Sequence, residues 1–394
     1  MILPQSIIDT DYIENNEVKL INSGAEYFKL LEKIITEAKY FIFLQTYIFD
    51  DDATGRSIQH ALINSAARNV KIFILIDSFG SGSLPNEFIN KLVATGIDFR
   101  YYGRYFSTWP FHLGRRLHHK AVVVDGVIAL VGGINIADKY NRINDHEPWL
   151  DFAVYCKGPV AETIQLVCER KWLKKNIKTV KLRNMGLYRN EHVDSTNNCL
   201  AGVRENDFLL NKQQVSNTYR MAFKLAEHDI VIAGGYFVPG VSFRKRIAQA
   251  VKRGVRVRII TGAKSDVRIS KYARQYLYNW MLGNGIEIYE YQKSVVHAKV
   301  AVVDKQWATI GSYDINNLSL SGNIEMNLDV LNRNFAANFH SLLLKTIKEN
   351  CIHITSEMVI KNNSLYIKLV MWTSYQIVRL FFWFNEMMVS TKRK

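Results

Sequence analysis

Two short stretches of the sequence combine histidine, lysine and aspartate at one spacing. Both read H-x-K-x4-D, with an apolar run after the lysine, in LHHKAVVVDGVIALVGGIN (117–135) and VVHAKVAVVDKQWATIGSYD (295–314). The candidate catalytic residues are His118, Lys120 and Asp125 in the first stretch, and His297, Lys299 and Asp304 in the second. One such motif beside a strand is weak evidence for a site, but two in equivalent contexts are strong evidence.

The residue types in these motifs suit chemistry at a phosphate group. Side chains alternate along an extended strand, so a histidine and a lysine two residues apart point to the same side. If two such strands meet, two imidazoles and two ammonium groups face one cavity. One neutral histidine can attack phosphorus, the other can give a proton to the leaving oxygen, and the lysines supply positive charge. We therefore expect neither a metal ion nor a cofactor.

The elements around the motifs also occur twice. The strand-like runs 40–49 and 70–77 flank a helical pattern, and the same order returns in 228–240, 243–254 and 255–262. Alternation of apolar strands with helices predicts an α/β fold. We expect two pseudo-twofold-related halves, each a mixed β-sheet flanked by helices, with the active site at their interface.

The repeat also sets the expected domain boundaries. The stretch 176–212, rich in lysine, asparagine and arginine, is the predicted crossing between the halves. The predicted parts are an N-terminal segment at 1–18, a first half at 19–200, a second half at 201–350 and a C-terminal tail at 351–394.

Composition and charge narrow the class of partner. Of the 394 residues 48% are hydrophobic, which is enough to fold most of the chain. The 51 Lys and Arg residues against 36 Asp and Glu give a net charge of +15, which favours polyanions such as nucleic acid or anionic lipid. Four scattered cysteines fit a reducing compartment, and the N-terminus shows no signal-peptide pattern, so we expect a cytoplasmic body.

The C-terminal stretch 369–384 is strongly apolar, but Arg379 interrupts it and makes it marginal as a membrane span. On a helix, Lys361, Lys368, Arg379 and Glu386 fall on one stripe, while aromatic and aliphatic residues cover the rest. This pattern is typical of a helix lying in a membrane interface. A helix docked on the protein's own core would show similar faces, so both interpretations stand.

The duplicated motif resembles the signature of the phospholipase D superfamily, H-x-K-x4-D followed by G-[SG]-x-N. The resemblance covers roughly residues 20–350. Within that superfamily the chain is most similar to bacterial cardiolipin synthases. The stretches that carry this likeness are QTYIFDDDATG, LIDSFGS, HHKAVVVDGVIALVGGINIADKY, WLDFAVYCKGPV, GYFVPG and WATIGSYDINNLSLSGNIE.

The resemblance implies roles for the residues at matching positions. It implies a covalent phosphohistidine on His118, with His297 as general acid and then general base. A carboxylate downstream of each motif orients an imidazole in the family, and the matching positions are Asp151 and Glu325. The motif aspartates are expected to bond backbone or neighbouring side chains near the site rather than to carry protons.

The resemblance also implies contacts to the substrate phosphate from Gly133, Asn135, Ser312 and Asn316. The first motif has Gly133 where many members have serine, and the second has Asp314 where asparagine is usual. A carboxylate repels a phosphate unless it is protonated or turned away. Because members often read G-S-x-N-x-D where this chain reads G-S-Y-D-I-N, we favour Asn316 over Asp314 as the phosphate ligand.

The activity implied by the resemblance is phosphatidyl transfer. The phosphatidyl group of one phosphatidylglycerol would move to His118 and then to the hydroxyl of a second, giving cardiolipin and glycerol. The expected partners are phosphatidylglycerol and a membrane surface, met peripherally or through the C-terminal tail on the cytoplasmic side of the cell membrane.

Three other functions are alternatives to phosphatidyl transfer. A phospholipase D-type hydrolase and a metal-independent nuclease would share the fold, and the positive charge could follow a nucleic-acid backbone. The synthase-type stretches and the apolar tail favour lipid over nucleic acid. A membrane scaffold with a degenerate site is disfavoured because both histidine–lysine pairs are complete. The acceptor alcohol, including water or phosphatidylethanolamine, and the oligomeric state stay open.

Overall fold

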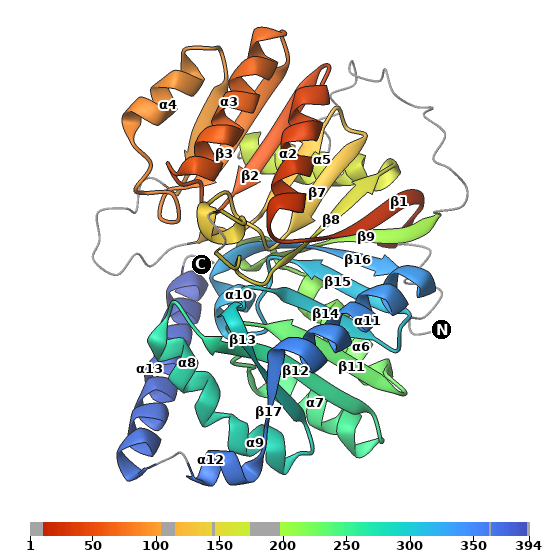
Figure 1. The fold of residues 1–394 in the computed structure, drawn as a ribbon, viewed down its shortest axis with the longest axis vertical. Helices are drawn as coiled ribbons and strands as arrows, with labels where there is room; N and C mark the ends of the chain where they lie inside the picture. The colour runs from red at the N-terminus through yellow and green to blue at the C-terminus, as the bar shows by residue number, and fades with distance from the viewer. Residues whose placement is uncertain (1–10, 104–114, 144–145, 174–197, 362–363, 392–394) are drawn as a thin grey trace.

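The computed structural model describes residues 11–103, 115–143, 146–173, 198–361 and 364–391. The chain forms two α/β halves, one above the other in Figure 1, with β-strands from both halves at their junction. The elements of the first half are β1 (Ile13–Asn22), α2 (Ala25–Glu37), β2 (Phe41–Thr46), α3 (Ala53–Ala67), β3 (Lys71–Asp77), α4 (Asn86–Val93), β4 (Asp98–Tyr102), β5 (Arg116–Leu117), β6 (Ala121–Val124), β7 (Ile128–Gly132), β8 (Phe152–Lys157) and α5 (Pro159–Leu173).

The second half continues with a closely similar series of elements. They are β9 (Cys199–Asp207), β10 (Lys212–Gln213), α6 (Gln214–Leu225), β11 (Asp229–Gly234), α7 (Val241–Lys252), β12 (Arg256–Lys264), α8 (Arg268–Tyr276), α9 (Tyr278–Gly283), β13 (Glu287–Val295), β14 (Lys299–Val303), β15 (Trp307–Gly311), α10 (Asn317–Ser321), β16 (Asn323–Leu331), α11 (Arg333–Asn350), β17 (Cys351–Ile354), α12 (Ser356–Lys361) and α13 (Leu365–Thr391).

The strand order of the two sheets is the same. The first sheet runs β4-β3-β2-β6-β7-β8-β1, and the second runs β13-β12-β11-β14-β15-β16-β9, with β17 added beside β13. In each sheet the first three of these strands are parallel and the others pair antiparallel. The predicted fold class, a duplicated unit with a mixed sheet in each half, is confirmed.

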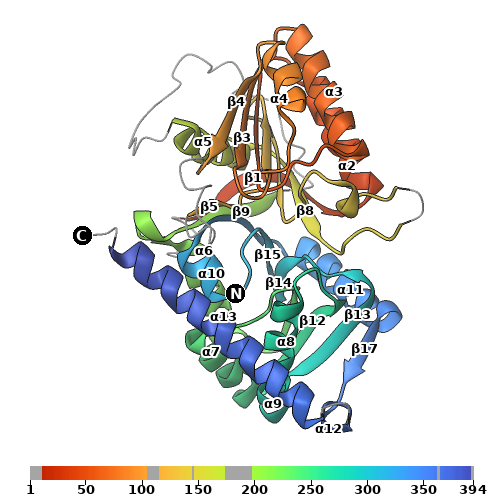
Figure 2. The same ribbon diagram turned by 90° about the vertical axis from the view of Figure 1, so that its left-hand side faces the viewer.

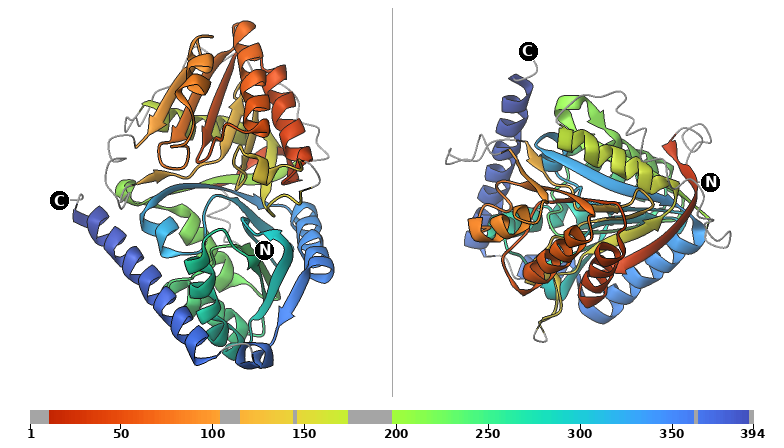
Figure 3. Two further views of the ribbon diagram at one scale, coloured as in Figure 1. Left: turned by 60° about the vertical axis from the view of Figure 1, so that its left-hand side comes forward. Right: turned by 90° about the horizontal axis from the view of Figure 1, so that it is seen from above.

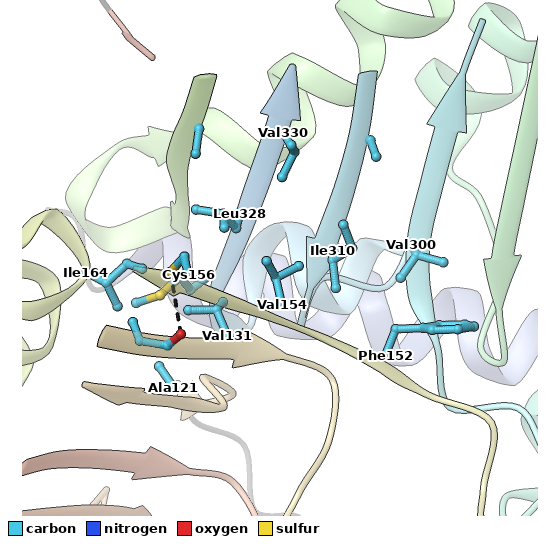
Figure 4. Close-up of a cluster of buried hydrophobic side chains, with 14 of the residues drawn as sticks. Ala121, Val131, Phe152, Val154, Cys156, Ile164, Val300, Ile310, Leu328 and Val330 are labelled. Atoms are coloured by element: carbon cyan, nitrogen blue, oxygen red, sulfur yellow. Dashed lines mark hydrogen bonds between the residues drawn. The ribbon is translucent and has the colours of Figure 1, made fainter. Parts of the chain in front are cut away.

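The halves share one hydrophobic core. It contains residues from both sheets, among them Val131 and Val154 from the first and Ile310 and Leu328 from the second, together with residues of α5 and α11 (Figure 4). On the other face of each sheet a separate core packs against helices, which include α2, α3 and α4 in the first half and α6, α7, α8, α9 and α13 in the second (Figures 1 and 3). The shared core fixes how the halves meet.

The sheets are also joined through strand pairs. β1 pairs with β8 in the first sheet and with β9 of the second, and β5 lies parallel to β16. β1 begins at Ile13, so part of the expected N-terminal segment belongs to the first sheet. β9 begins at Cys199, close to the expected start of the second half. The expected tail begins with β17, which extends the second sheet.

Helix α13 runs along the outside of the second half and packs beside α8, and its C-terminal end reaches the junction of the halves (Figure 2). Met371 and Tyr375 are buried on its inner face, and the Tyr375 ring stacks on Tyr276 at 4.7 Å. Leu369 and Leu380 are 58% and 66% exposed on the other face. No helix in the described part of the chain is both long enough and apolar enough to span a bilayer.

Candidate active site at the junction of the halves

The backbone around each histidine is held by the opposite half. The N–H of His118, just after β5, donates to the carbonyl oxygen of Ile324 in β16 (2.9 Å). In the matching place, the N–H of His297 donates to the carbonyl oxygen of Leu150 in the first half (2.9 Å). The two histidines are thus placed by equivalent contacts across the junction, as a pseudo-twofold arrangement requires.

Each imidazole also contacts a carboxylate from the opposite half. His118 Nδ1 lies 2.8 Å from Glu325 Oε2, and His297 Nδ1 lies 2.6 Å from Asp151 Oδ2. Both carboxyl side chains are completely buried. The structure therefore brings the two candidate carboxylates to the two candidate histidines. The exchange of partners between the halves was not foreseen, and it follows from the backbone pairing, because each carboxylate residue directly follows the residue that accepts the histidine N–H.

The surroundings of His118 define its protonation. Nδ1 faces two acceptors, the Glu325 carboxylate and the carbonyl oxygen of Ser312 (3.1 Å), so Nδ1 carries the hydrogen and Nε2 keeps its lone pair. Burial outweighs the effect of Glu325 and lowers the pKa of His118 to about 4. Burial opposes ionisation of Glu325, but contacts with His118 and the charge of Lys120 lower its pKa overall. At neutral pH this pair is a neutral imidazole on an ionised carboxylate.

The second pair, His297 with Asp151, holds its proton differently from the first. Burial, followed by the charges of Lys299 and Lys120, lowers the pKa of His297 well below its usual value. Burial raises the pKa of Asp151 to about 7, although both lysines act against this shift. The two groups are hydrogen-bonded and titrate as a unit. Below about pH 7 the His297–Asp151 pair therefore holds one proton more than the His118–Glu325 pair.

The two motif lysines are buried beside their histidines. Lys120 Nζ donates to the carbonyl oxygen of His118 (2.9 Å), and Lys299 Nζ donates to that of His297. Burial, with the charge of Lys299, lowers the pKa of Lys120 to about 7. Asp314 Oδ2 lies 3.7 Å from Lys299 Nζ, and burial raises the pKa of Asp314 to about 6. Asp314 thus offsets positive charge in one half, whereas the matching residue in the other half is an asparagine.

Gly133 and Ser312 occupy equivalent positions behind the carboxylates. The Ser312 hydroxyl donates to Glu325 and accepts from the N–H of Met326 (3.0 Å). A Cβ on Gly133 would fall on the Asp151 carboxylate. The serine therefore holds one carboxylate, and the glycine leaves room for the other. These contacts account for the glycine in the first motif, and a phosphate-binding role for either residue stays a prediction.

The two candidate asparagines make contacts within the protein. Asn135 Oδ1 accepts from the N–H of Ile48 (3.0 Å), and its Nδ2 donates to the Tyr140 hydroxyl (2.8 Å). Asn316 is the N-cap of α10, where its Oδ1 accepts from the N–H of Ser319 (2.9 Å). Both side chains therefore shape the loops around the site, and their contact with a phosphate also stays a prediction.

The motif aspartates are turn residues that bond backbone. Asp125 accepts from the N–H groups of residues 39–41, and Asp304 from those of residues 227–229. Both lie in left-handed backbone, with φ of 53° and 51°, in the tight turns of the β6–β7 and β14–β15 hairpins. The expected backbone bonding is present. Its place, however, is at the far end of β6 and β14 from the histidines, so these residues are not near the site.

Two tyrosines that the motifs do not include flank the imidazoles. Tyr47 lies edge-on to His118, with ring centroids 5.0 Å apart, and Tyr236 lies edge-on to His297 at 6.1 Å. The motif lysine ammonium lies over each tyrosine ring, at 5.2 and 5.8 Å from its centroid. Both tyrosines follow equivalent strands, β2 and β11. The alignment of the repeat pairs Tyr47 with Tyr236, and this pairing is the sequence signal that could have identified them as site residues. Among the described residues no group of three or more His, Cys, Asp and Glu could hold a metal ion.

The fold and site define a class of duplicated α/β proteins with two H-x-K-x4-D motifs at the junction of the halves. A family model described as "Cardiolipin synthase, PLD-like domain" matches residues 31–150 and 219–346. The chain therefore belongs to the phospholipase D-like family of cardiolipin synthases, as the resemblance predicted.

Similar proteins cover most of the chain. Cardiolipin synthase B of Escherichia coli (strain K12) is 32% identical over 360 residues, which covers 88% of this chain and 84% of that protein. Cardiolipin synthase A of Pseudomonas syringae pv. syringae is 31% identical over 335 residues, covering 84% of this chain and 68% of that protein.

Solved structures support the fold. The phosphatidylserine synthase of Haemophilus influenzae Rd KW20 superposes with a TM-score of 0.71 over 98% of both chains, at 13% identity. The polyphosphate kinase of Porphyromonas gingivalis gives a TM-score of 0.57 over 86% of this chain and 49% of that chain, at 14% identity. At these identities the likeness extends to the fold alone.

Proposed function

We propose that this protein is a phosphatidyltransferase of the cardiolipin synthase type. It moves the phosphatidyl group of one phosphatidylglycerol to the headgroup hydroxyl of a second, through a phosphohistidine. The observation that carries the proposal is the pair of exchanged histidine–carboxylate contacts, with two lysines, at the junction of the halves. Membership of the family supplies the reaction class.

The first step forms the phosphohistidine on His118. The Nδ1–H of His118 is held by Glu325, which leaves the Nε2 lone pair free to attack phosphorus. A bond forms between Nε2 and phosphorus, and the bond between phosphorus and the glycerol oxygen breaks. His297, in the pair that carries the additional proton, gives that proton to the departing oxygen. Free glycerol leaves, and Lys120 and Lys299 balance the charge of the phosphoryl oxygens.

The second step reverses the roles of donor and acceptor. The hydroxyl of a second phosphatidylglycerol gives its proton to His297 and bonds to phosphorus, while the phosphorus–nitrogen bond to His118 breaks. The product is cardiolipin, and His118 is neutral again. Water in place of the lipid hydroxyl would give phosphatidic acid, so the same residues perform hydrolysis whenever water is the acceptor.

The exposed apolar face of α13 supports peripheral binding to a membrane surface, which we propose is the cytoplasmic side of the cell membrane. Leu369, Leu380 and Trp383 are 58%, 66% and 59% exposed, and Lys368 and Arg379 are exposed on the same helix. Exposed apolar side chains flanked by basic ones suit the interface of an anionic bilayer. The inner face of α13 packs on α8, as expected for a helix docked on the protein's own core. The outer face is the one that we propose to lie in the membrane interface.

The reaction is tested with purified protein and phosphatidylglycerol vesicles, with and without a chelator, by mass spectrometry of the lipids. We expect cardiolipin and free glycerol, unaffected by the chelator. Phosphatidic acid without cardiolipin would contradict transfer and assign a hydrolase. Unchanged lipid would refute both and lead to assays on nucleic acid.

Membrane binding is tested by placing charge on the exposed face of α13. The double variant Leu369→Glu, Leu380→Glu should sediment roughly 10-fold less with anionic vesicles, because two exposed leucines that would insert into the bilayer are replaced by charges. Val241→Glu is the matched control, since Val241 is 73% exposed on α7 of the same half. Equal sedimentation of the double variant and the wild type would contradict this role of α13.

A further inference from the structure

The surroundings of His297 contain an aromatic wall, formed by Tyr140 and Trp149, that has no counterpart at His118 among the residues that the structure describes. The Tyr140 ring lies 5.2 Å and the Trp149 ring 5.9 Å from the His297 imidazole, measured between centroids. Counting from the aligned motifs, the matching positions on the His118 side hold Ser319 and Asn323. The wall is therefore on the side of the proposed acid and base, where glycerol leaves and the acceptor hydroxyl enters.

A lysine lies over this aromatic wall. Lys139 belongs to the short 3-10 helix Asp138–Tyr140, and its Nζ is 5.1 Å from the Trp149 centroid and 5.8 Å from that of Tyr140. Its aligned position in the second half is Leu318, so this cation has no counterpart. Within the part of the chain that the structure describes, no carboxylate lies within 4.0 Å of Lys139 Nζ. Lys139 and Trp149 are both partly exposed, which leaves them open to a ligand.

The charge of Lys139 is close enough to act on the site. Burial and the motif lysines are the main causes of the lowered pKa of His297, and Lys139 adds to them. The motif lysines lie beside the two histidines, where the reacting phosphate is proposed to bind, whereas Lys139 shares with His297 the rings of Tyr140 and Trp149. A second anion near the site, beside the acceptor hydroxyl, is the ligand that this position fits.

The acceptor of the proposed reaction carries such an anion. In phosphatidylglycerol three carbons separate the attacking hydroxyl oxygen from the ester oxygen of the lipid's own phosphate. When the acceptor hydroxyl is at His297, the phosphate of the acceptor lipid has to bind a short distance away. We propose that Lys139 and Trp149 form a subsite for the acceptor lipid, in which the ammonium binds the phosphodiester and the indole face packs on the glycerol carbons. This inference rests on the proposed transferase function and deepens it.

The subsite is tested by comparing two acceptors for one phosphatidyl-enzyme. With phosphatidylglycerol vesicles and isotopically labelled glycerol, cardiolipin formation reports the anionic acceptor, and labelled phosphatidylglycerol reports the neutral one. Lys139→Met should lower cardiolipin formation by about 10- to 100-fold, the usual effect of losing a charge-assisted hydrogen bond. It should change glycerol exchange by about 3-fold or less, since glycerol carries no phosphate. Lys139→Arg, which keeps the charge, should restore most of the cardiolipin formation.

A matched control and two outcomes decide the inference. Lys19→Met removes another lysine that lies over an aromatic ring. Lys19 is on β1, with its Nζ 5.8 Å from the centroid of Tyr155 on β8, and its replacement should change neither reaction. An equal fall of both reactions in Lys139→Met, or of neither, would overturn the subsite. If the wild type performs neither reaction, the proposed function itself fails, and the acceptor subsite fails with it.

Discussion

The halves of this protein share a strand order but surround their histidines with different groups. His118 meets a glutamate that is held by Ser312, and its Nδ1 is enclosed by acceptors. His297 meets an aspartate backed by Gly133, and the aspartate has a pKa raised to about 7 by burial. The repeated backbone places the imidazoles, and the non-repeated neighbours set their protonation. This difference supports a nucleophile on one side and a proton carrier on the other.

Replacement of the two histidines tests this division most strongly. His118→Ala and His297→Ala should each lower turnover of phosphatidylglycerol by about 10⁴-fold or more, since each removes a reacting group. With a phosphatidyl ester of nitrophenol, whose leaving group needs no proton, only His297→Ala should form a covalent adduct, detected by intact-protein mass spectrometry. An adduct in His118→Ala would refute the assignment of the nucleophile.

Exchange of the residues behind the carboxylates should have a smaller effect. Gly133→Ser places an atom where the Asp151 carboxylate lies and should displace it from His297, lowering activity by about 100-fold. Ser312→Gly removes one hydrogen bond to Glu325 and should cost roughly 10-fold. Both are measured as cardiolipin formation alongside melting temperature. Equal losses in the two variants would show that the halves tolerate the exchange equally.

The smallest expected effect concerns Asp314 and the pH profile. The proposed reaction needs protonated Lys120 and the proton of the His297–Asp151 pair, so kcat/KM should fall as pH rises through about 7. The negative charge of Asp314 raises the pKa of both Lys120 and Asp151. Asp314→Asn should therefore move this alkaline limb to lower pH. A limb that stays in place or moves to higher pH would contradict the coupling.

Much of the fold and site follows from local pattern. The apolar strands, the repeat and the two motifs predicted the mixed sheets, and His118, His297, Asp151 and Glu325 lie together as expected. The exchange of carboxylates could not be predicted, because it depends on which residues of β16 pair with β5.

By contrast, the position of the motif aspartates away from the site could have been predicted from the sequence. The D-G pair between two apolar runs at Asp125 is a strong signal for a hairpin turn, and a turn residue lies a whole strand away from the residue that precedes that strand. The proposed role of Lys139 could not be predicted from the sequence, because it depends on rings contributed by separate segments.

The exchanged carboxylates have a consequence for the chain during its synthesis. The first half emerges from the ribosome carrying His118 and Lys120, but the strand that places His118 and the glutamate that orients its imidazole come about two hundred residues later. For His297 the order is reversed, because Asp151 is synthesised before the histidine that it contacts. An unfinished or half-folded chain therefore lacks both histidine–carboxylate pairs. We expect phospholipid turnover to begin only when both halves have docked, so that an incomplete copy of the enzyme leaves lipids unchanged.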